Sequence, residues 1–161
     1  MVKIRRILIP LTSLAIIVVL GICHGLCANK FHTVVTVFDG DTIALDDGRK
    51  VRLIGVDAPE VESPYRKREP FGDESRVYLS ALILEKKISL VVGDPPKDRY
   101  GRTLAYVYMG DVLVNGRIIR DGWAFAYRKF HHQWSDLFLI YEREARSRGI
   151  GIWKKEKKGD Q

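Results

Sequence analysis

Cysteine is scarce in this chain of 161 residues and absent from most of it. The two cysteines, Cys23 and Cys27, both lie within the first 28 residues. Residues 29–161 therefore contain no thiol, which excludes a disulfide framework and a thiolate metal site from that part. Histidine is also rare, since only His32, His131 and His132 lie beyond residue 28. This supply is poor for a zinc site, and we expect His131 and His132 to be surface loop residues.

Acidic residues are missing from the first 28 positions, which carry three basic residues followed by an apolar run over residues 7–22. A basic start, an apolar stretch and a small residue at Ala28 are typical of a secretory signal peptide. The run is short for a membrane span, which needs roughly 20 apolar residues. An uncleaved anchor facing outside remains an alternative, because Leu26 is large for a cleavage site. We expect residues 1–28 to be a signal peptide and the protein to be secreted or periplasmic.

A lipid anchor at Cys23 is a further alternative for this leader. The bulky Ile22 directly before this cysteine disfavours it. The remaining reading is that both cysteines are small apolar residues of a segment that is removed.

The net charge of +7 is distributed unevenly along the chain. Residues 1–28 hold three positive charges, and the tail 154–161 holds four positive and two negative ones. Residues 29–153 hold 20 positive and 18 negative charges, so they are close to neutral. A basic balance indicates an anionic partner such as nucleic acid, but most of the excess here lies at the two ends.

The whole chain is 46% hydrophobic, as is usual for a globular protein, and its middle, residues 29–153, has the length of one domain. Short alternating or β-branched runs predict strands, and longer periodic runs predict helices. The expected strands are 33–37, 42–45, 50–56, 88–92 and 103–109, and the expected helices are 72–87, 114–123 and 135–148. We expect Ser135 to cap the last helix. This order predicts an α+β, mostly β fold, in which helices pack on a small closed barrel.

Two aspartates follow strand-like segments and are candidate metal ligands. Asp41 comes after Gly40, and Asp57 comes after Val56. If both lie on one rim of a barrel, their carboxylates are hard oxygen ligands that suit Ca²⁺ or Mg²⁺. Each aspartate alone is equally explained as a turn residue that caps its own backbone.

Basic side chains accompany these acids. Arg52 interrupts an apolar strand, and it either pairs with an anion at the barrel mouth or lies on the solvent face. Glu60 is a candidate general base or an ordinary loop acid. The segment 98–102 places Arg99 and Arg102 around Tyr100, which suits phosphate binding and base stacking but also an ordinary solvated turn.

Five motifs in order carry a specific resemblance. They are Asp39-Gly40-Asp41-Thr42, Arg52-Leu53-Ile54-Gly55-Val56-Asp57-Ala58-Pro59-Glu60, Asp98-Arg99-Tyr100-Gly101-Arg102, Val114-Asn115 and Gly149-Ile150-Gly151-Ile152-Trp153. From about Val34 to Trp153 the chain closely resembles the staphylococcal nuclease (thermonuclease) family. The resemblance implies a five-stranded OB-fold barrel with three helices. It also implies a secreted, Ca²⁺-dependent nuclease that cleaves DNA and RNA without sequence specificity and leaves 3′-phosphate ends.

The resemblance also implies roles for individual residues. Asp41 and Asp57 fall on the calcium carboxylates, and Ala58 falls where the family's archetype has a threonine that offers its backbone carbonyl. Catalytic roles fall on Arg52, Glu60 and Arg102. Contacts to the bound nucleotide fall on Arg99, Tyr100 and Tyr127.

A non-catalytic OB-type nucleic-acid-binding or protein-binding module is the alternative function. Degenerate family members of that kind lose the acids and arginines of the site. This chain keeps all five: Asp41, Arg52, Asp57, Glu60 and Arg102. We expect a monomer that contacts a membrane only if the leader is retained. We expect the larger aromatic residues to belong to the core: Trp123, Phe125, Phe130, Trp134 and Trp153.

Overall fold

The computed structural model describes residues 30–64 and 67–154. The expected signal peptide, residues 1–28, lies outside the described residues, as does the basic tail beyond Lys154. None of the helices within the described ranges has the length and apolar character that crossing a membrane requires.

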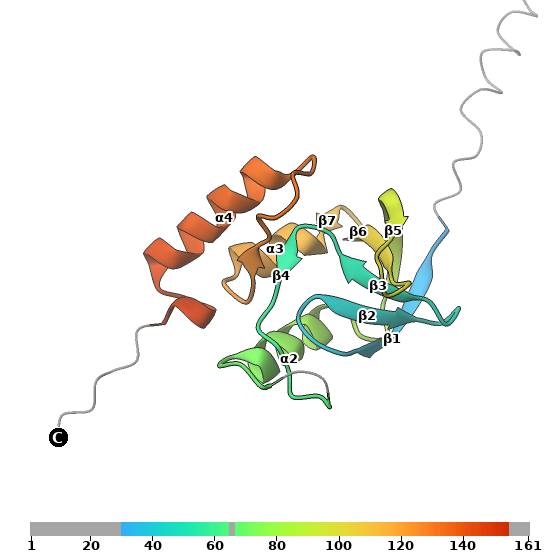
Figure 1. Ribbon diagram of the computed structural model, residues 1–161, viewed down its shortest axis with the longest axis horizontal. Helices are drawn as coiled ribbons and strands as arrows, with labels where there is room; N and C mark the ends of the chain where they lie inside the picture. Colours follow the sequence, from blue (N-terminus) through green and yellow to red (C-terminus); the bar gives the residue numbers. More distant parts are fainter. Residues whose placement is uncertain (1–29, 65–66, 155–161) are drawn as a thin grey trace, which may run out of the picture.

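Five strands form a closed barrel on one side of the molecule (Figure 1). They are β1 (His32–Val37), β2 (Thr42–Leu45), β3 (Lys50–Leu53), β5 (Lys87–Lys97) and β6 (Thr103–Met109). Neighbours in the order β3-β2-β1-β5-β6 are antiparallel, and a parallel pairing of β3 with β6 closes the barrel. The sequence-based prediction of an α+β, mostly β fold with a five-stranded OB-type barrel is confirmed.

Three short strands lie beside the barrel. The strand β7 (Val112–Leu113) forms a hairpin with β6. The strands β4 (Val56–Asp57) and β8 (Phe125–Ala126) pair with each other as a separate ribbon. This ribbon brings the segment after residue 125 next to Asp57, which is distant from it in the sequence.

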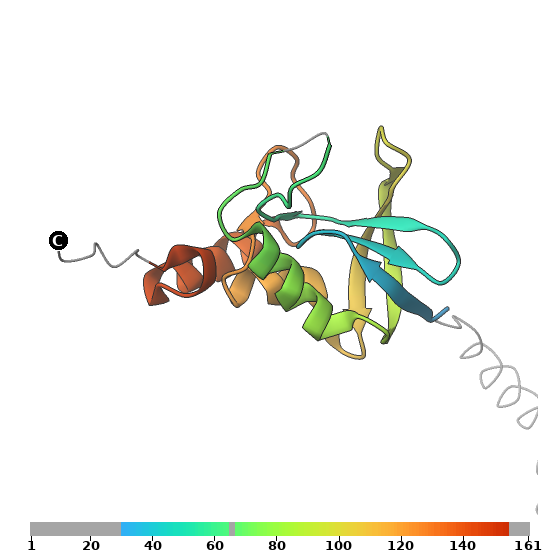
Figure 2. The ribbon, with the colours of Figure 1, turned by 90° about the horizontal axis from the view of Figure 1, so that it is seen from below.

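The helices are α2 (Gly72–Ile83), α3 (Val114–Arg120) and α4 (Ser135–Arg148), followed by the 3₁₀ turn η1 (Gly151–Trp153). Figures 1 and 2 show α4 on the far side of α3 from the barrel, with α2 lying along β1. The expected cap is wrong: Ser135 is the first residue of α4, and its Oγ accepts a hydrogen bond from the His132 N–H instead. Trp134 occupies the cap position without a side-chain hydrogen bond.

The core lies where the inner faces of the strands meet the helices. Alternate residues of β3, Val51 and Leu53, point inward, while Lys50 is exposed and Arg52 is only partly buried. Helix residues such as Leu79 of α2 complete the core.

A buried asparagine joins three elements behind the site. The Oδ1 atom of Asn115, the second residue of α3, accepts the Val107 N–H at 2.8 Å, and Nδ2 donates to the carbonyls of Ile54 and Ala105. The neighbouring Gly55 has a φ of 76°, and a Cβ there would lie 2.3 Å from the His132 ring. This packing fixes the turn between β3 and β4. The candidate site residue Arg52 lies before this turn, and Asp57 lies after it.

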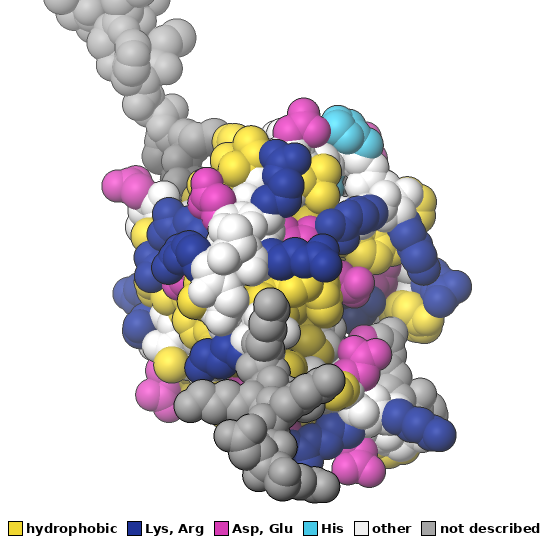
Figure 3. All heavy atoms as spheres, turned by 90° about the vertical axis from the view of Figure 1, so that its left-hand side faces the viewer, with side chains coloured by type: hydrophobic (Ala, Val, Ile, Leu, Met, Phe, Trp, Pro, Cys, Tyr) yellow, Lys and Arg dark blue, Asp and Glu magenta, His cyan; other side chains and the backbone are white. Residues whose placement is uncertain are grey.

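The surface charge around α4 is mixed. Figure 3 shows this end of the molecule, where Lys and Arg side chains alternate with Asp and Glu side chains. Within it, Arg128 pairs with the buried Glu142 at 2.6 Å. On this face, charges of both signs are interspersed.

Candidate active site

Arg52 of β3 bridges two carboxylates that the sequence singled out. Its Nη2 lies 2.9 Å from Asp41 Oδ2 and 3.8 Å from Asp57 Oδ1. Its Nη1 donates to the backbone carbonyls of Leu53 and Val56, at 3.1 and 2.7 Å. The side chain of Arg52 thus faces the acids at the barrel rim, and of the two interpretations left open by the sequence the structure favours the anion-paired one.

The carboxyl group of Asp41 is almost completely buried. It accepts hydrogen bonds from the Ala58 N–H and from the Thr42 hydroxyl, at 3.1 and 2.9 Å. Burial raises the pKa of Asp41 well above its ordinary value; the Arg52 guanidinium opposes this rise, and the nearby charge of Asp39 adds to it. The local environment therefore penalises the negative charge of Asp41 unless further positive charge is brought to it.

Asp57 ends β4, Ala58 follows it, and the two residues face the site differently. The side chain of Asp57 is 55% exposed, so it meets solvent where Asp41 does not. Ala58 is buried, and its N–H fixes the Asp41 carboxylate. Ala58 thus contacts Asp41 directly, whereas Asp57 is joined to Asp41 through the Arg52 guanidinium.

Glu60 lies on the loop that leads from β4 to α2. Its backbone is held twice by Glu69, whose Oε2 accepts the Glu60 N–H at 3.1 Å and whose N–H donates to the Glu60 carbonyl at 2.9 Å. Gly72, at the start of α2, packs so closely that a Cβ there would lie 2.2 Å from the Glu60 carbonyl oxygen. The loop therefore has a defined path at Glu60.

Arg102 reaches the site from the residue before β6, the strand that pairs with β3. Its Nη1 donates to Thr42 Oγ1 at 3.2 Å, and Thr42 in turn donates to Asp41. Its Nε pairs with Asp98 at 2.7 Å. Desolvation raises the pKa of Asp98, but the hydrogen bonds from Arg102 and from the Tyr100 and Arg102 N–H groups lower it more, so the net shift is downward. The pair holds Arg102 at the edge of the acidic cluster.

Arg99 and Tyr100 lie at the tip of the same turn and are exposed to solvent. Arg99 Nη2 donates to the Tyr100 hydroxyl at 2.7 Å, and the Arg99 guanidinium lies 4.8 Å from the Tyr100 ring centroid. Arg102 lies on the same ring at 5.5 Å. These side chains form an exposed cationic and aromatic surface next to Arg102.

Tyr127 follows β8. The pairing of β8 with β4 places the Tyr127 backbone beside the turn between β3 and β4. The Tyr127 N–H donates to the Gly55 carbonyl at 3.0 Å. Its ring lies 6.1 Å from that of Phe130, which is 73% exposed. The assignment of Phe130 to the core is therefore wrong, because this residue lies at the tip of the loop between β8 and α4.

The similarity of this chain to known proteins shows which family it belongs to. Residues 50–155 match the family described as "Staphylococcal nuclease homologue". The chain is 36% identical over 133 residues to the thermonuclease of Staphylococcus intermedius, covering 79% of this chain and 78% of that protein. The chain belongs to the staphylococcal nuclease family. The resemblance inferred from the five motifs is confirmed.

Other members of the family match more of the chain. An endonuclease of Haemophilus influenzae is 37% identical over 155 residues, covering 92% of this chain and 79% of that protein. The micrococcal nuclease of Shigella flexneri is 32% identical over 161 residues, covering 92% and 88%. These relatives support a nuclease activity for this member of the staphylococcal nuclease family.

One acidic residue of the site was missed by the sequence analysis. Asp39 Oδ1 accepts the Asp41 N–H at 2.9 Å, and its charge contributes to the raised pKa of Asp41. The signal was present in the spacing Asp39-Gly40-Asp41, where a tight turn brings both carboxyl groups to one side. Asp39 enters the sequence analysis only in the motif Asp39-Gly40-Asp41-Thr42 and is given no role of its own there.

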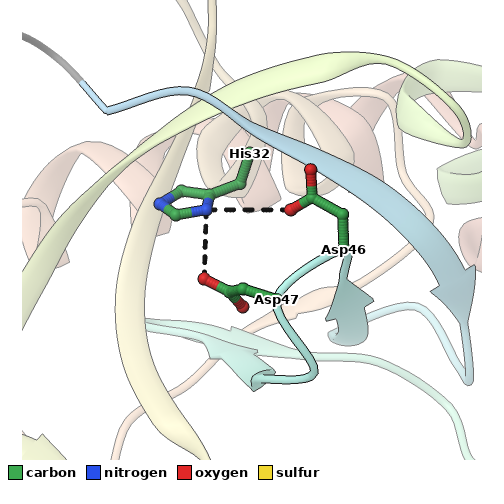
Figure 4. A group of neighbouring side chains, drawn as sticks. All are labelled: His32, Asp46 and Asp47. Atoms are coloured by element: carbon green, nitrogen blue, oxygen red, sulfur yellow. Dashed lines mark ion pairs between the residues drawn. The ribbon is translucent and has the colours of Figure 1, made fainter.

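A second group of possible metal ligands lies elsewhere on this nuclease-family barrel. Figure 4 shows His32 of β1 with Asp46 and Asp47 of the β2–β3 turn; His32 Nδ1 is 3.8 and 3.2 Å from their carboxylates. Arg49 Nη2 lies 2.8 Å from both His32 Nε2 and Asp47 Oδ2. The Arg49 guanidinium already supplies the positive charge at this cluster. We therefore interpret the cluster as a set of ion pairs that holds β1 against the β2–β3 turn.

The two other histidines differ from each other. His131 is exposed, as expected, but His132 is partly buried and packs 5.2 Å from the Phe138 ring. Burial lowers the pKa of His132, and the charge of His131 lowers it further. The expectation of a surface position for His132 is therefore wrong.

Proposed function

We propose that this protein is an exported, Ca²⁺-dependent phosphodiesterase that hydrolyses DNA and RNA without sequence specificity and leaves 3′-phosphate ends. The observation that carries the proposal is the bridge of Arg52 between Asp41 and Asp57, with Arg102 connected to Asp41 through Thr42. A non-catalytic binding module has no need for this combination of buried acid and arginine forks.

The donor set of the site fits a calcium ion. Ca²⁺ takes carboxylate and carbonyl oxygens. The Asp41 and Asp57 carboxyl groups flank the Arg52 guanidinium, and the Asp39 carboxyl group accepts the Asp41 N–H beside them. The buried charge of Asp41 also favours a cation, because burial alone penalises it. We propose that Asp41, Asp57 and the Ala58 carbonyl hold the ion. Bound there, Ca²⁺ would supply Lewis-acid polarisation of the phosphate.

In this proposal the two arginines, Arg52 and Arg102, stabilise the negative charge of the phosphate. Phosphodiester hydrolysis places additional negative charge on the phosphate oxygens in the transition state. Arg52 and Arg102 would donate to these oxygens through planar forks that match them. Donors of this kind, held in place beforehand, are worth roughly 3–4 kcal/mol each. Asp98 and the Leu53 and Val56 carbonyls hold the two guanidiniums in position before the substrate binds.

Glu60 would orient or deprotonate the attacking water, which is typically worth roughly 10²- to 10⁴-fold in rate. The defined path of its backbone supports this role, because the carboxylate starts from a fixed point. Arg99 and Tyr100 would contact the nucleotide from an exposed turn, and Tyr127 would contact it from its partly buried position directly after β8. We further propose that the protein acts as a monomer.

The decisive experiment incubates the purified protein with single-stranded DNA and with RNA, in Ca²⁺ and then in excess chelator. We expect cleavage of both polymers in Ca²⁺ only, with 3′-phosphate ends identified by end labelling. Binding without cleavage in either condition would favour the non-catalytic alternative. Cleavage that persists in chelator would contradict the Ca²⁺ assignment while leaving the nuclease activity intact.

Export requires its own test, because the leader lies outside the described residues. We expect the protein to appear in the periplasm or medium with residues 1–28 removed. Cell fractionation and N-terminal sequencing check this. A membrane fraction that retains the leader would favour the anchored alternative.

A further inference from the structure

A hollow of about 310 Å³ opens next to Arg102 on the outside of the barrel. We call it the β3–β6 hollow. It is lined by residues 48–50, which end the β2–β3 turn and begin β3, by Lys97 at the end of β5, and by residues 100–103, which lead into β6. The pairing of Val51 with Thr103 and of Lys97 with Thr103 explains why these segments meet.

The lining of this hollow carries charge of one sign. Its charged side chains are Arg49, Lys50, Lys97 and Arg102, and no acid lines it. Arg49 is paired with Asp47, and Arg102 is paired with Asp98, both just outside the lining. With the described residues, Lys50 and Lys97 form no ion pair. The hollow therefore presents two uncompensated ammonium groups to whatever enters it.

The hollow is continuous with the candidate active site. Arg102 belongs to both, because it lines the hollow and also donates to Thr42 beside Asp41. Lys50 lies two residues from Arg52 on β3, so the two side chains share one face of the strand, about 7 Å apart along it. That spacing is comparable to the distance between successive phosphates of an extended single strand.

Aromatic groups accompany these cations. Lys50 Nζ lies 4.8 Å from the ring centroid of Phe38, which is 40% exposed on the turn that carries Asp41. Tyr100, 63% exposed, lies in the hollow itself. Cations that alternate with exposed rings are typical of surfaces that track a single strand, because cations bind the phosphates and rings stack on the bases.

We propose that the β3–β6 hollow is an extended subsite that holds the phosphodiester backbone of a single strand next to the scissile nucleotide, with Lys50 and Lys97 as its phosphate contacts. The inference rests on the proposed function. It makes the enzyme a binder of polymers rather than of dinucleotides, since the nucleotides beyond the cleavage point contribute to affinity.

The test measures binding independently of cleavage. A nuclease-resistant phosphorothioate 12-mer and a phosphorothioate dinucleotide, both fluorescently labelled, are titrated with the full-length protein over a range of salt concentrations. The variants are Lys50→Ala, Lys97→Ala and the double variant. Lys87→Ala is the matched control, because Lys87 is an exposed lysine at the opposite end of the same strand as Lys97.

Each phosphate contact to a single strand contributes a salt slope of roughly 0.7, which corresponds to about a fivefold loss of affinity at 0.1 M salt when one contact is removed. We expect losses of that size for each single variant on the 12-mer and about 25-fold for the double variant. The dinucleotide affinity should stay unchanged, as should all values for Lys87→Ala.

The outcomes separate this inference from the proposed function. A double variant that binds the 12-mer like the Lys87→Ala control would overturn the subsite, even if the protein is an active nuclease. Equal losses on the dinucleotide would also overturn it, because the hollow would then be a local phosphate pocket and not a path for a strand. Lysine-dependent binding of the 12-mer, together with no cleavage of unmodified single-stranded DNA in Ca²⁺, would support the subsite and contradict the catalytic proposal instead.

Discussion

Arg52 combines a structural and an electrostatic task in one side chain. Its Nη1 donates to the Leu53 and Val56 carbonyls of the β3–β4 turn. Its Nη2 faces the carboxylates of Asp41 and Asp57. Only a fork with several donors in fixed directions meets all four partners, because an ammonium group is a point charge on a flexible stem. The requirement for arginine at this position follows from that geometry.

Replacing Arg52 by lysine is therefore expected to lower kcat at least about 100-fold. Lysine keeps the charge but loses the planar two-pronged contact to the phosphate. Initial rates on single-stranded DNA at saturating Ca²⁺ measure the loss. Arg143→Lys, an exposed arginine on α4, is the matched control and should keep its rate. A rate for Arg52→Lys within a few-fold of wild type would remove Arg52 from the proposed chemistry.

Sequence reasoning located most single residues of the site but not their surroundings. Asp41, Asp57, Arg52 and Arg102 are recognisable by type and order. Whether Arg52 faces solvent or acid depends on the backbone path after Leu53, which pattern alone does not define. Asp39 was missed for the same reason, since only the folded turn shows that its carboxyl lies beside that of Asp41.

At the level of elements, the loop from β4 to α2 shows how Glu60 is positioned. The carboxylate of Glu69 accepts the Glu60 N–H, and the two backbones are joined by a second hydrogen bond. Gly72 allows α2 to begin directly against this junction. We therefore regard Glu69 as a positioning residue for Glu60.

Glu69→Ala is expected to lower kcat about tenfold with little change in KM, because a hydrogen bond to a charged group worth roughly 1.5–3 kcal/mol is lost. Glu69→Gln keeps an oxygen acceptor and should restore most of the rate. Steady-state kinetics on single-stranded DNA separate kcat from KM. Equal rates for the alanine and glutamine variants and wild type would show that the junction does not position Glu60.

The sequence predicted which helices and strands exist better than it predicted where each of them ends. The strand expected at 88–92 extends to Lys97, although Gly93, Asp94 and two prolines interrupt its apolar pattern. Pairing of Lys97 with Thr103 maintains it, and backbone pairing of this kind leaves no trace in the side-chain pattern. The helix expected to reach Lys87 ends at Ile83, because Glu85 has a left-handed backbone with a φ of 61°.

On the scale of the whole molecule, barrel closure assembles the site. The parallel pairing of Arg52 with Leu104 joins β3 to β6 and places Arg102 next to residues that are about 50 positions earlier in the chain. The family resemblance predicted this topology, whereas strand patterns alone did not define which strands close the barrel. The net charge of +7 was a weaker guide, because the β3–β6 hollow owes its character to two lysines that form no ion pair with the described residues.

The proposed calcium site, with its buried carboxylate among other acids, would link calcium binding to the stability of the whole fold. A ligand that binds only the folded state stabilises it by about 2.7 kcal/mol at 100 times its Kd. For a domain of this size we expect Ca²⁺ to raise Tm by roughly 10 °C, measured by thermal unfolding in Ca²⁺ and in chelator. Asp41→Asn should lose this rise, because the neutral amide no longer attracts the ion, while Asp136→Asn on exposed α4 should keep it. A full rise in Asp41→Asn would place the calcium site elsewhere, with the cluster of His32, Asp46 and Asp47 as the next position to test.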